Sequence, residues 1–468
     1  MSTVLFPTQD SPHARRAALA RAAVNLACGI AYGAALALIY RNLSVWWDYL
    51  GFTYQPLPAE QLVGLVLFAG IPAAFLPVSP KTLSGFVTWI LYFTLFLPAM
   101  LIPPLQGFAD RGTALALLFT LWASALGFVL AARIRRLVIN PLPVNPRAFW
   151  IGIGLLWLGG HALVAYYFSS VLNFAALGDV YEQRAVGADI AGSSLIMYLM
   201  YNLAGAVNPL LIAVGIAYRR KLALAAGVVG QIVIYSTLAN KVVILSTFVI
   251  AGTVFLFDKD NRLRVWRISS IFLAIVLIGI PLTGRYTPDT GFGSDLIDIM
   301  YMRTLCLPGV LIGAYNDFFS RFPVTYFSHS WVGALFTTYP YGDLSVGQVI
   351  GDYLTPSGSY DYNNYNAGFL ASDGLTSLGI VGLPVSTALT ASCIWGIDCL
   401  TTRVDRRVLF ASFIPFLMSL ADGSLFTSLL TSGGIFLSLL LYLGGGAPPR
   451  DRRLRQLGMP SPILEKTL

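Results

Sequence analysis

The chain has 468 residues, of which 56% are hydrophobic and only 11% are charged, and its mean hydropathy is +0.71. Because a water-soluble domain carries about 25% charged residues, this composition excludes a soluble globular protein. The net charge of +8 would suit a nucleic-acid partner, but the positions of the basic residues explain it differently.

Apolar stretches close to the bilayer-spanning length of about 20 residues follow one another along the chain. We expect membrane-crossing helices at 18–40, 61–79, 83–103, 112–132, 148–169, 193–217, 222–238, 242–257, 268–283, 369–397, 408–421 and 425–443. The polar start of the chain leads into the first stretch without a signal-peptide cleavage pattern. We therefore expect that this span is not cleaved off and stays part of the protein. The sequence therefore predicts an all-α polytopic membrane protein with about 12 spans, which form a single transmembrane domain over residues 1–468.

The distribution of Lys and Arg orients these spans. With the N-terminus in the cytoplasm, 23 of the 30 basic residues fall in cytoplasmic connections or in the two ends of the chain. Such an enrichment in short cytoplasmic loops is the positive-inside pattern, and it explains the basic net charge without nucleic acid. We therefore expect both termini in the cytoplasm and the working surface on the far side of the membrane.

Two connections on the far side are too long to be simple turns. They cover residues 170–192 and 284–368, and long connections in compact domains are usually functional or disordered. The second connection is rich in aromatic residues rather than in charge, so we expect it to fold. Within it, residues 303–315 are apolar but short and are interrupted by Pro308 and Gly309, which favours a re-entrant or interfacial helix over a span.

Seven basic residues fall on the far side, and two of them have an ordinary explanation. Arg41 and Arg111 lie at the very ends of predicted spans, where a basic side chain reaches lipid headgroups. Four others form a candidate anion-binding cluster: Arg184, Lys241, Arg285 and Arg303. Each could form a local ion pair or reach headgroups instead, but together they suit a phosphate or pyrophosphate.

His329 is the one histidine in a far-side loop, and it is the candidate general base because an imidazole accepts a proton near neutral pH. A structural role is the commoner alternative for a lone loop histidine. Several carboxylates compete with it: Asp179, Glu182, Asp295, Asp298, Asp343, Asp361 and Asp373. Neither a His-Glu-x-x-His motif nor paired cysteines occur, and there is no Walker loop, so we expect neither a metal nor a nucleotide cofactor.

Aromatic and amide side chains are dense in the second long connection, most of all in SGSYDYNNYNAG at 357–368. Aromatic rings stack on sugars, and amide and phenol groups hydrogen-bond to sugar hydroxyls. The candidate glycan-binding residues are Tyr301, Tyr362, Asn363, Asn364 and Tyr365. An aromatic belt at the membrane interface is the alternative explanation for part of this enrichment.

Several of these features together resemble a known family. They are the long far-side loop before the last helices, the segment YEQRAVGAD around Arg184, the hairpin pair Asn240 and Lys241, and the stretch NNYNAGFLASDGLTSLGIVGLP at 363–384. Over most of residues 150–443 the chain resembles the O-antigen polymerases, which are Wzy-type polymerases of lipid-linked oligosaccharide repeat units.

The resemblance implies a GT-C-like glycosyltransferase of the bacterial inner membrane, with 170–192 and 284–368 as periplasmic loops. Its substrate would be an undecaprenyl-pyrophosphate-linked oligosaccharide, which stores the reaction energy and needs no further cofactor. The pyrophosphate would contact Arg184, Lys241, Arg285 and Arg303, and catalysis would involve His329, Arg184 and Arg303. Membrane lipids and a chain-length regulator are further expected partners, and nucleic acid is not. The Arg-x10-Gly pattern of some members is absent after Arg184 and Arg303, so their motif-based assignments are not carried over.

Two other functions fit the same pattern. An O-antigen ligase would pass the same lipid-linked glycan to a lipid A core. A 12-span transporter or lipid-linked oligosaccharide flippase would fit the number of spans, but transporters usually carry ionisable residues inside their spans and have related halves. The predicted spans are almost free of charge, which favours the polymerase.

Overall fold

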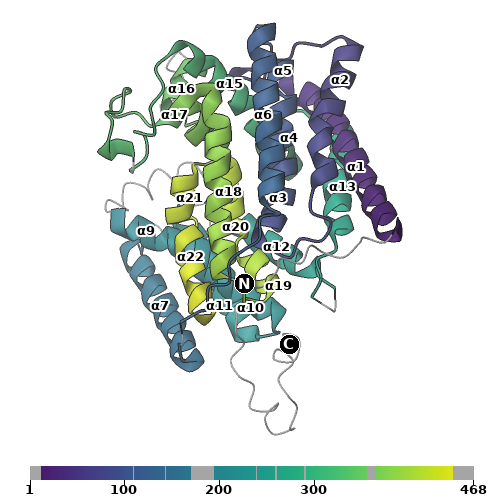
Figure 1. Ribbon diagram of the computed structural model, residues 1–468. Coiled ribbons are helices and arrows are strands. Elements are labelled where there is room, and N and C mark those ends of the chain that lie inside the picture. The colour runs from purple at the N-terminus through teal and green to yellow at the C-terminus, as the bar shows by residue number, and fades with distance from the viewer. Residues whose placement is uncertain are drawn as a thin grey trace. The chain divides into compact units, whose positions relative to one another are not determined.

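The computed structural model describes residues 12–108, 110–142, 144–169, 194–238, 240–258, 261–288, 291–331, 333–355 and 364–445. Helices make up the regular structure of these residues, apart from an isolated antiparallel bridge between Phe257 and Leu263 (Figure 1). The predicted all-α fold is thus confirmed.

Contacts divide the chain into two compact units. Unit 1 is Met1–Arg136, Leu256–Asp398 and Phe416–Leu429, and unit 2 is Leu137–Phe255, Cys399–Pro415 and Leu430–Leu468.

Unit 1 begins with α1 and ends in short helices. Its first half has α1 (Pro12–Ser44), η1 (Asp48–Leu50), α2 (Ala59–Gly70), η2 (Ile71–Phe75), α3 (Leu83–Leu91), η3 (Tyr92–Phe96), α4 (Leu97–Leu101), α5 (Pro103–Gln106) and α6 (Arg111–Ala131). Its second half has α13 (Val265–Gly284), α14 (Phe292–Ile297), η5 (Asp298–Cys306), α15 (Leu307–Arg321), η6 (Gly333–Leu335), α16 (Val346–Leu354), η7 (Leu370–Leu375), α17 (Thr376–Leu378), η8 (Gly379–Val381) and α18 (Gly382–Leu400). Most of α20 (Ile414–Asp422) and α21 (Leu425–Thr431) also belongs to this unit.

Unit 2 contains the remaining helices. They are α7 (Pro146–Tyr167), α9 (Ser194–Asn202), η4 (Leu203–Val207), α10 (Asn208–Ala217), α11 (Lys221–Leu238), α12 (Lys241–Phe255), α19 (Arg406–Ser412), α22 (Gly434–Leu440) and η9 (Leu441–Gly445). Within this unit α10 packs on α11, α12 and α19. The predicted loop at 170–192 lies outside the described residues.

Eight helices in the described part of the chain are long and apolar enough to cross a membrane. They are Ala18–Ser44, Leu83–Gln106, Arg111–Ala131, Pro146–Tyr167, Leu195–Ala217, Val265–Gly284, Gly293–Arg321 and Leu370–Leu400. A ninth candidate is the bent pair Leu425–Thr431 and Gly434–Gly444, whose halves meet at 45°. Shorter apolar helices cover Ala59–Phe75, Lys221–Thr237 and Lys241–Phe255. The helices thus indicate a multi-pass membrane protein, while the number of 12 spans stays a prediction.

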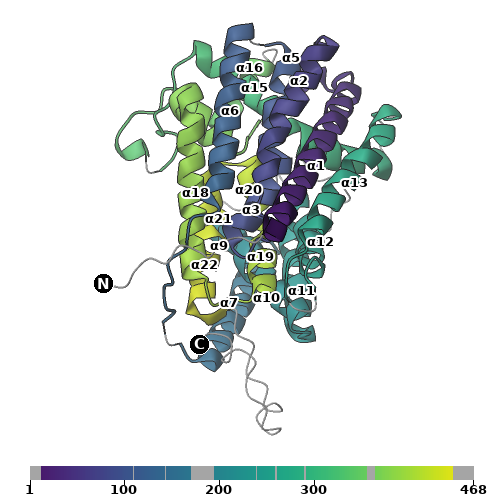
Figure 2. The same cartoon turned by 45° about the vertical axis from the view of Figure 1, so that its right-hand side comes forward.

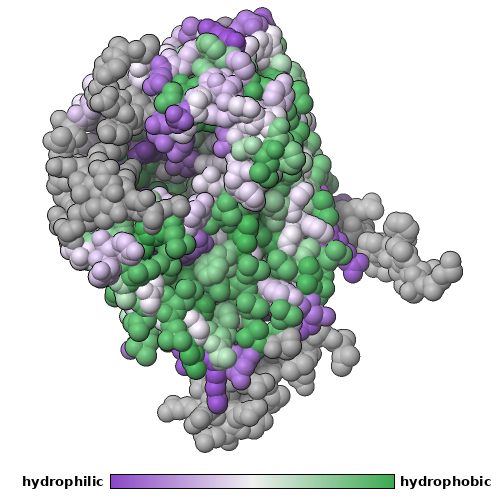
Figure 3. All heavy atoms as spheres, turned by 90° about the vertical axis from the view of Figure 1, so that its left-hand side faces the viewer, coloured by the Kyte–Doolittle hydropathy of each residue, from purple (hydrophilic) through white to green (hydrophobic). Residues whose placement is uncertain are grey.

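The surface of these helices is apolar, as contact with lipid requires. On α7, Ile151, Leu155 and Leu158 are each more than 60% exposed, and their spacing puts them on one side of the helix. On α13, Leu277 and Ile278 are more than half exposed. Figure 3 shows such apolar side chains, in green, over a wide part of one face. A soluble protein rarely exposes apolar patches of this size to water.

The run from α3 to α5 forms the centre of unit 1, and almost all of it is buried. Against it, α1 and α13 lie side by side (Figure 2). Phe93 of the central run stacks on Phe272 of α13, with ring centroids 5.0 Å apart, and its carbonyl accepts a hydrogen bond from the Tyr32 hydroxyl of α1. The central run ends at Gln106, whose side-chain amide donates to Gly51 O and Val310 O. We call this end, where α1 also finishes, the Gln106 end of unit 1.

The segment 303–315 is longer and more regular than the sequence predicts. It lies in a continuous helix over Gly293–Arg321 that is not interrupted at Pro308. The π-helical stretch η5 precedes Pro308, and such a local change in the hydrogen-bonding pattern is one way in which a helix accommodates a proline. Tyr301 of this helix donates to Ile275 O of α13, and Val310 accepts from Gln106. The helix therefore lies at the Gln106 end.

The candidate span Leu370–Leu400 contains a sharp turn. Gly379 has φ +59, a conformation that favours glycine, and it separates η7 and α17 from the long helix α18. Gly374 and Gly382 pack backbone to backbone, because a Cβ on Gly382 would lie 1.9 Å from the Gly374 carbonyl oxygen. The residues before Gly379 therefore fold back against the start of α18.

We predict that Asp398 anchors the start of α3. Its two carboxylate oxygens accept from Leu83 N at 2.6 Å and Ser84 N at 3.0 Å, and the side chain is buried. Asp398→Ala leaves two buried N–H groups without acceptors, so it should lower the free energy of unfolding by about 2–4 kcal/mol. Asp110→Ala, which removes the exposed cap of α6, is the matched control and should lower it less. Equal losses in thermal unfolding of the two variants would contradict this prediction.

Candidate functional site

A polar loop after α15 carries His329 and is fixed to α17. Thr325 N donates to Thr376 O at 2.8 Å, and Tyr326 N donates to Ser377 O at 3.0 Å. Tyr326 and Phe327 have φ +48 and +65, in the left-handed region that bulky residues rarely adopt. Such strained backbone is retained where the surrounding structure enforces it, and it is found most often at functional sites.

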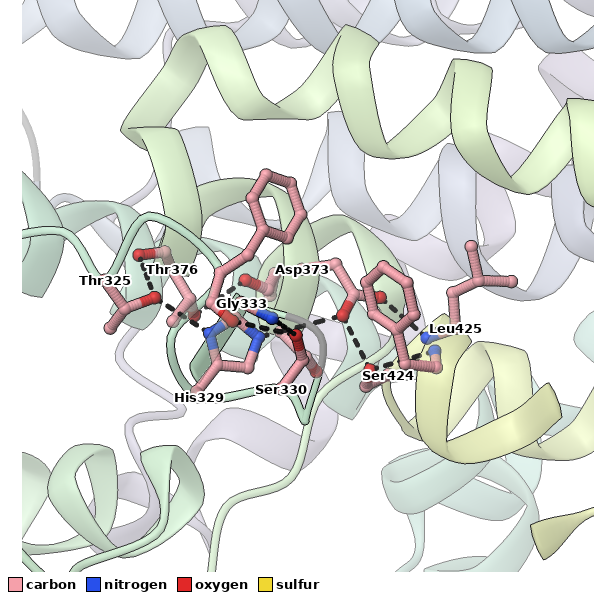
Figure 4. A network of polar contacts seen from close by, with 12 residues as sticks. Thr325, His329, Ser330, Gly333, Asp373, Thr376, Ser424 and Leu425 are labelled. Atoms are coloured by element: carbon pink, nitrogen blue, oxygen red, sulfur yellow. Dashed lines mark hydrogen bonds and ion pairs between the residues drawn. The ribbon is translucent and has the colours of Figure 1, made fainter. Parts of the chain in front are cut away.

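The hydrogen bonds of His329 leave one ring nitrogen without a partner. The Thr325 hydroxyl donates to Thr376 O at 3.1 Å, and its oxygen lies 2.8 Å from His329 Nδ1, within hydrogen-bonding distance (Figure 4). His329 Nε2 is buried and has no hydrogen-bond partner among the described residues. It lies 3.8 Å from Asp373 Oδ1. The neutral tautomer with its proton on Nδ1 presents Nε2 as a proton acceptor beside a carboxylate.

Asp373 links this histidine to the start of α21. One carboxylate oxygen accepts from the Ser424 hydroxyl and the other from Leu425 N, both at 2.6 Å. Because the Ser424 proton goes to Asp373, this serine is not activated by the histidine. The order of the three groups therefore differs from that of a Ser-His-Asp nucleophile, in which the histidine lies between the other two. The arrangement suits acid–base chemistry at His329 instead.

A second part of the site combines a carboxylate and a cation. The hydroxyl of Tyr315 on α15 lies within electrostatic range of both Asp373 and Asp422, and it donates to Tyr365 O at 2.8 Å. Asp422, at the end of α20, is exposed to solvent. Arg303 lies near enough to attract the Asp422 carboxylate. We call Arg303, Tyr315, His329, Asp373, Asp422 and Ser424 the polar cluster.

Arg303 is free to bind a ligand. Its side chain is exposed, and it makes neither a hydrogen bond nor an ion pair with any described residue. Arg321, near the other end of α15, differs because it donates to Asp317 Oδ1 at 2.7 Å, while Asp317 also accepts from Tyr353. Within the part of the chain that the structure describes, the polar cluster therefore holds a guanidinium without an ion-pair partner, and guanidinium groups are well suited to phosphate.

Two tyrosines that follow the His329 loop, Tyr339 and Tyr353, do not readily lose their hydroxyl protons. Burial, together with the nearby Tyr341, raises the pKa of Tyr339 to about 12. Burial and the hydrogen bond to Asp317 raise the pKa of Tyr353. These hydroxyls stay protonated at neutral pH, so His329 is the neighbouring group suited to proton transfer.

Of the four predicted cations, the structure brings Arg303 to the polar cluster. Arg285 directly follows α13 and is exposed. Lys241 begins α12 in unit 2, and Arg184 lies outside the described residues. The convergence of all four on one ligand therefore stays a prediction.

The predicted glycan-binding residues occupy different surroundings. The Tyr301 side chain is buried against α13, and its hydroxyl donates to Ile275 O at 3.0 Å. Tyr365 is buried beside the polar cluster, because its carbonyl accepts from Tyr315, and the neighbouring Asn364 is exposed. Tyr362 and Asn363 lie outside the described residues. Asn364 is thus the described member of this set that a glycan could reach directly.

The sequence did not single out Asp422 and Ser424. They lie in the connection LADGSL between two apolar stretches, 408–421 and 425–443. A tight connection between two spans needs no charge, so an acidic residue there was a usable signal. Asp373 was one of several competing carboxylates, and its contact with the start of α21 distinguishes it from the others.

Two further observations bear on the function of the polar cluster: the lack of metal-ligand groups among the described residues and the comparison with known proteins. Where the structure describes the chain, no three His, Cys, Asp or Glu side chains are grouped so that they could hold a metal ion. No family model, curated protein or solved structure matches the chain. The function is therefore argued from the geometry of the polar cluster.

We predict that the Asp373 carboxylate is needed for the stability of this region. In Asp373→Asn, an amide N–H₂ must face the Ser424 hydroxyl or Leu425 N, so one buried donor loses its acceptor. The free energy of unfolding should fall by about 1–3 kcal/mol. Ser424→Ala removes one bond and leaves Leu425 N satisfied, so its loss should be smaller. Thermal unfolding of the purified variants in detergent measures both, and a larger loss in Ser424→Ala would refute the interpretation.

Proposed function

We propose that this protein is a membrane glycosyltransferase of GT-C-like build with about 12 spans. It polymerises undecaprenyl-pyrophosphate-linked oligosaccharide repeat units of O-antigen or a related surface polysaccharide. In this proposal it lies in a bacterial inner membrane, has both termini in the cytoplasm and works at the periplasmic face. The main support is that, among the described residues, the buried Nε2 of His329 has no hydrogen-bond partner and the side chain of Arg303, in the same cluster, makes no ion pair.

The proposed reaction joins the growing glycan to a new lipid-linked unit. A hydroxyl oxygen of the acceptor sugar attacks the anomeric carbon of the donor, and His329 Nε2 takes the hydroxyl proton. The bond between that carbon and the pyrophosphate oxygen breaks, and undecaprenyl pyrophosphate leaves with the electron pair. Asp373, 3.8 Å from Nε2, stabilises the imidazolium that forms.

Arg303 stabilises the charge of the leaving group in this reaction. A guanidinium binds phosphate oxygens in bidentate geometry, and Arg303 lies near enough to Asp422 to attract its carboxylate. Arg184, Lys241 and Arg285 remain proposed contacts of the pyrophosphate. Because the pyrophosphate ester already stores the reaction energy, a base and a preorganised cation are sufficient chemistry.

An O-antigen ligase is the closest alternative, because it would use the same donor and the same groups. The two differ in their acceptor, so purified lipid-linked repeat units distinguish them. A polymerase lengthens these units without any other acceptor, whereas a ligase requires a lipid A core.

A transporter or flippase for the same lipid-linked glycan is the second candidate. The folded-back segment before Gly379 and the bent pair Leu425–Thr431 and Gly434–Gly444 favour it, because transporters often build their sites from discontinuous helices. Reconstitution in vesicles separates the two functions. A transporter moves the lipid-linked unit across the bilayer without changing its length.

His329 provides the first test of the proposed reaction. His329→Gln removes the proton acceptor at Nε2, so the rate of chain lengthening should fall about 10²–10⁴-fold. The assay is the length distribution of glycan made by reconstituted protein from purified lipid-linked units. The melting temperature should stay close to that of the wild type, which separates loss of chemistry from loss of folding. A variant that makes chains of normal length at the normal rate rules out the general base.

Arg303 provides the second test, with Arg321 as its matched control. Arg303→Gln removes a charge that the transition state needs, so the rate should fall about 100-fold or more. Arg303→Lys keeps the charge but not the bidentate geometry, so it should retain an intermediate rate. Arg321→Gln breaks a surface ion pair and should change the rate little. Equal effects of Arg303→Gln and Arg321→Gln would remove Arg303 from the site.

A further inference from the structure

A cleft at the Gln106 end of unit 1 shares no residue with the polar cluster. Its volume is about 620 Å³, which is within the usual size of small-molecule sites. It is formed by the end of α1, the segment around η1 and the residues that follow α13. Its lining includes Arg41, Trp46, Asp48, Tyr54, Gly284 and Tyr286.

Hydrogen bonds hold the walls of this cleft in place. Asn42 Nδ2 at the end of α1 donates to Thr283 Oγ1 of α13 at 3.2 Å. The Tyr286 hydroxyl donates to Asp298 Oδ1 at 2.6 Å, and the Thr53 hydroxyl donates to Gln106 O at 2.8 Å. The cleft is therefore built from parts that are fixed to one another.

Two opposite charges line the cleft without neutralising each other. The side chain of Arg41 makes neither a hydrogen bond nor an ion pair with any described residue, so it is not paired with Asp48. Three aromatic residues line the same space, and the rings of Trp46 and Tyr286 meet edge to face with centroids 6.4 Å apart. A ligand that carries both a cation and an anion would complement this lining, whereas a purely anionic ligand would meet the Asp48 carboxylate.

The cleft lies where a lipid headgroup would be found. The apolar candidate spans Ala18–Ser44 and Val265–Gly284 both end beside it. Val45 is 74% exposed and Trp46 is 39% exposed next to the cleft. Exposed tryptophan and basic residues at the ends of apolar helices are typical of the membrane–water interface.

We propose that this cleft binds a zwitterionic phosphate ester of the phosphoethanolamine type. Arg41 binds the phosphate, and the ammonium group lies between the Asp48 carboxylate and the faces of Trp46, Tyr54 and Tyr286. A primary ammonium can donate hydrogen bonds to Asp48, whereas a trimethylammonium group cannot. The site is independent of the proposed glycosyl transfer, since it uses none of the groups of the polar cluster.

The test measures which lipid the full-length protein retains. We reconstitute it in nanodiscs with equal amounts of phosphatidylethanolamine, phosphatidylglycerol and phosphatidylcholine, extract it in mild detergent and count bound lipids by native mass spectrometry. Phosphatidylethanolamine should be retained in preference to both others. Equal retention of the three lipids, or a preference for phosphatidylglycerol, overturns the proposal even if no variant can be purified.

Variants then assign the two charges. Arg41→Gln should lower retention of phosphatidylethanolamine about tenfold, because a charge-assisted phosphate contact is lost. Asp48→Asn should lower it similarly and should increase retention of phosphatidylglycerol. Arg111→Gln, an exposed cation at the start of α6 outside the cleft, is the matched control and should change neither. A preference for phosphatidylethanolamine that survives Asp48→Asn contradicts the assignment.

A soluble headgroup identifies the source of the ligand. Glycerophosphoethanolamine is titrated into the detergent-solubilised protein and compared with short-chain phosphatidylethanolamine. Binding of the lipid alone assigns the site to the bilayer, and binding of both with similar affinity assigns it to the free phosphate ester. If neither binds, the proposal is wrong.

Discussion

The carboxylate of Asp373 is the interaction on which the candidate site depends. It joins the segment that folds back before α18 to the first residues of α21, since it accepts from both Ser424 and Leu425 N. The same segment supplies Thr376, whose carbonyl accepts from the backbone and side chain of Thr325 and so fixes the loop of His329. A buried carboxylate is tolerated only when donors satisfy it, and here both donors come from neighbouring residues about 50 positions later in the sequence.

The sequence selects candidate residues for the site but does not show how they are held together. His329 and Arg303 could be selected because few basic residues and a single loop histidine fall on the far side of the expected membrane. Asp422 could have been selected as a charge in a tight connection, but nothing in LADGSL shows that this connection folds toward His329 rather than into solvent. The approach of Asp373 to α21 depends on packing between segments about 50 residues apart, which no local pattern records.

The fold was predictable in kind but not in the course of each helix. Hydropathy locates apolar stretches, but it does not show whether a stretch is straight. The predicted span 369–397 turns at Gly379, and 425–443 bends near Gly433, which has φ +86. The predicted span 408–421 is divided between α19 and α20. In each case a local change in backbone geometry bends or divides the helix. The mean hydropathy over about 20 residues does not detect such a change.

The helix Gly293–Arg321 also determines how the spans should be counted. The chain enters it from the end of α13, beside Asn42 of α1 and thus at the Gln106 end. The later helix α18 finishes where Asp398 caps the start of α3, so α18 itself starts from the Gln106 end. The chain therefore arrives at this helix and departs for α18 on one and the same side. If Gly293–Arg321 crossed the membrane, the end of α13 and the start of α18 would lie on opposite sides. The contacts of α13 with α1 and of α18 with α3 place them on the same side, so this helix should not be counted as a crossing.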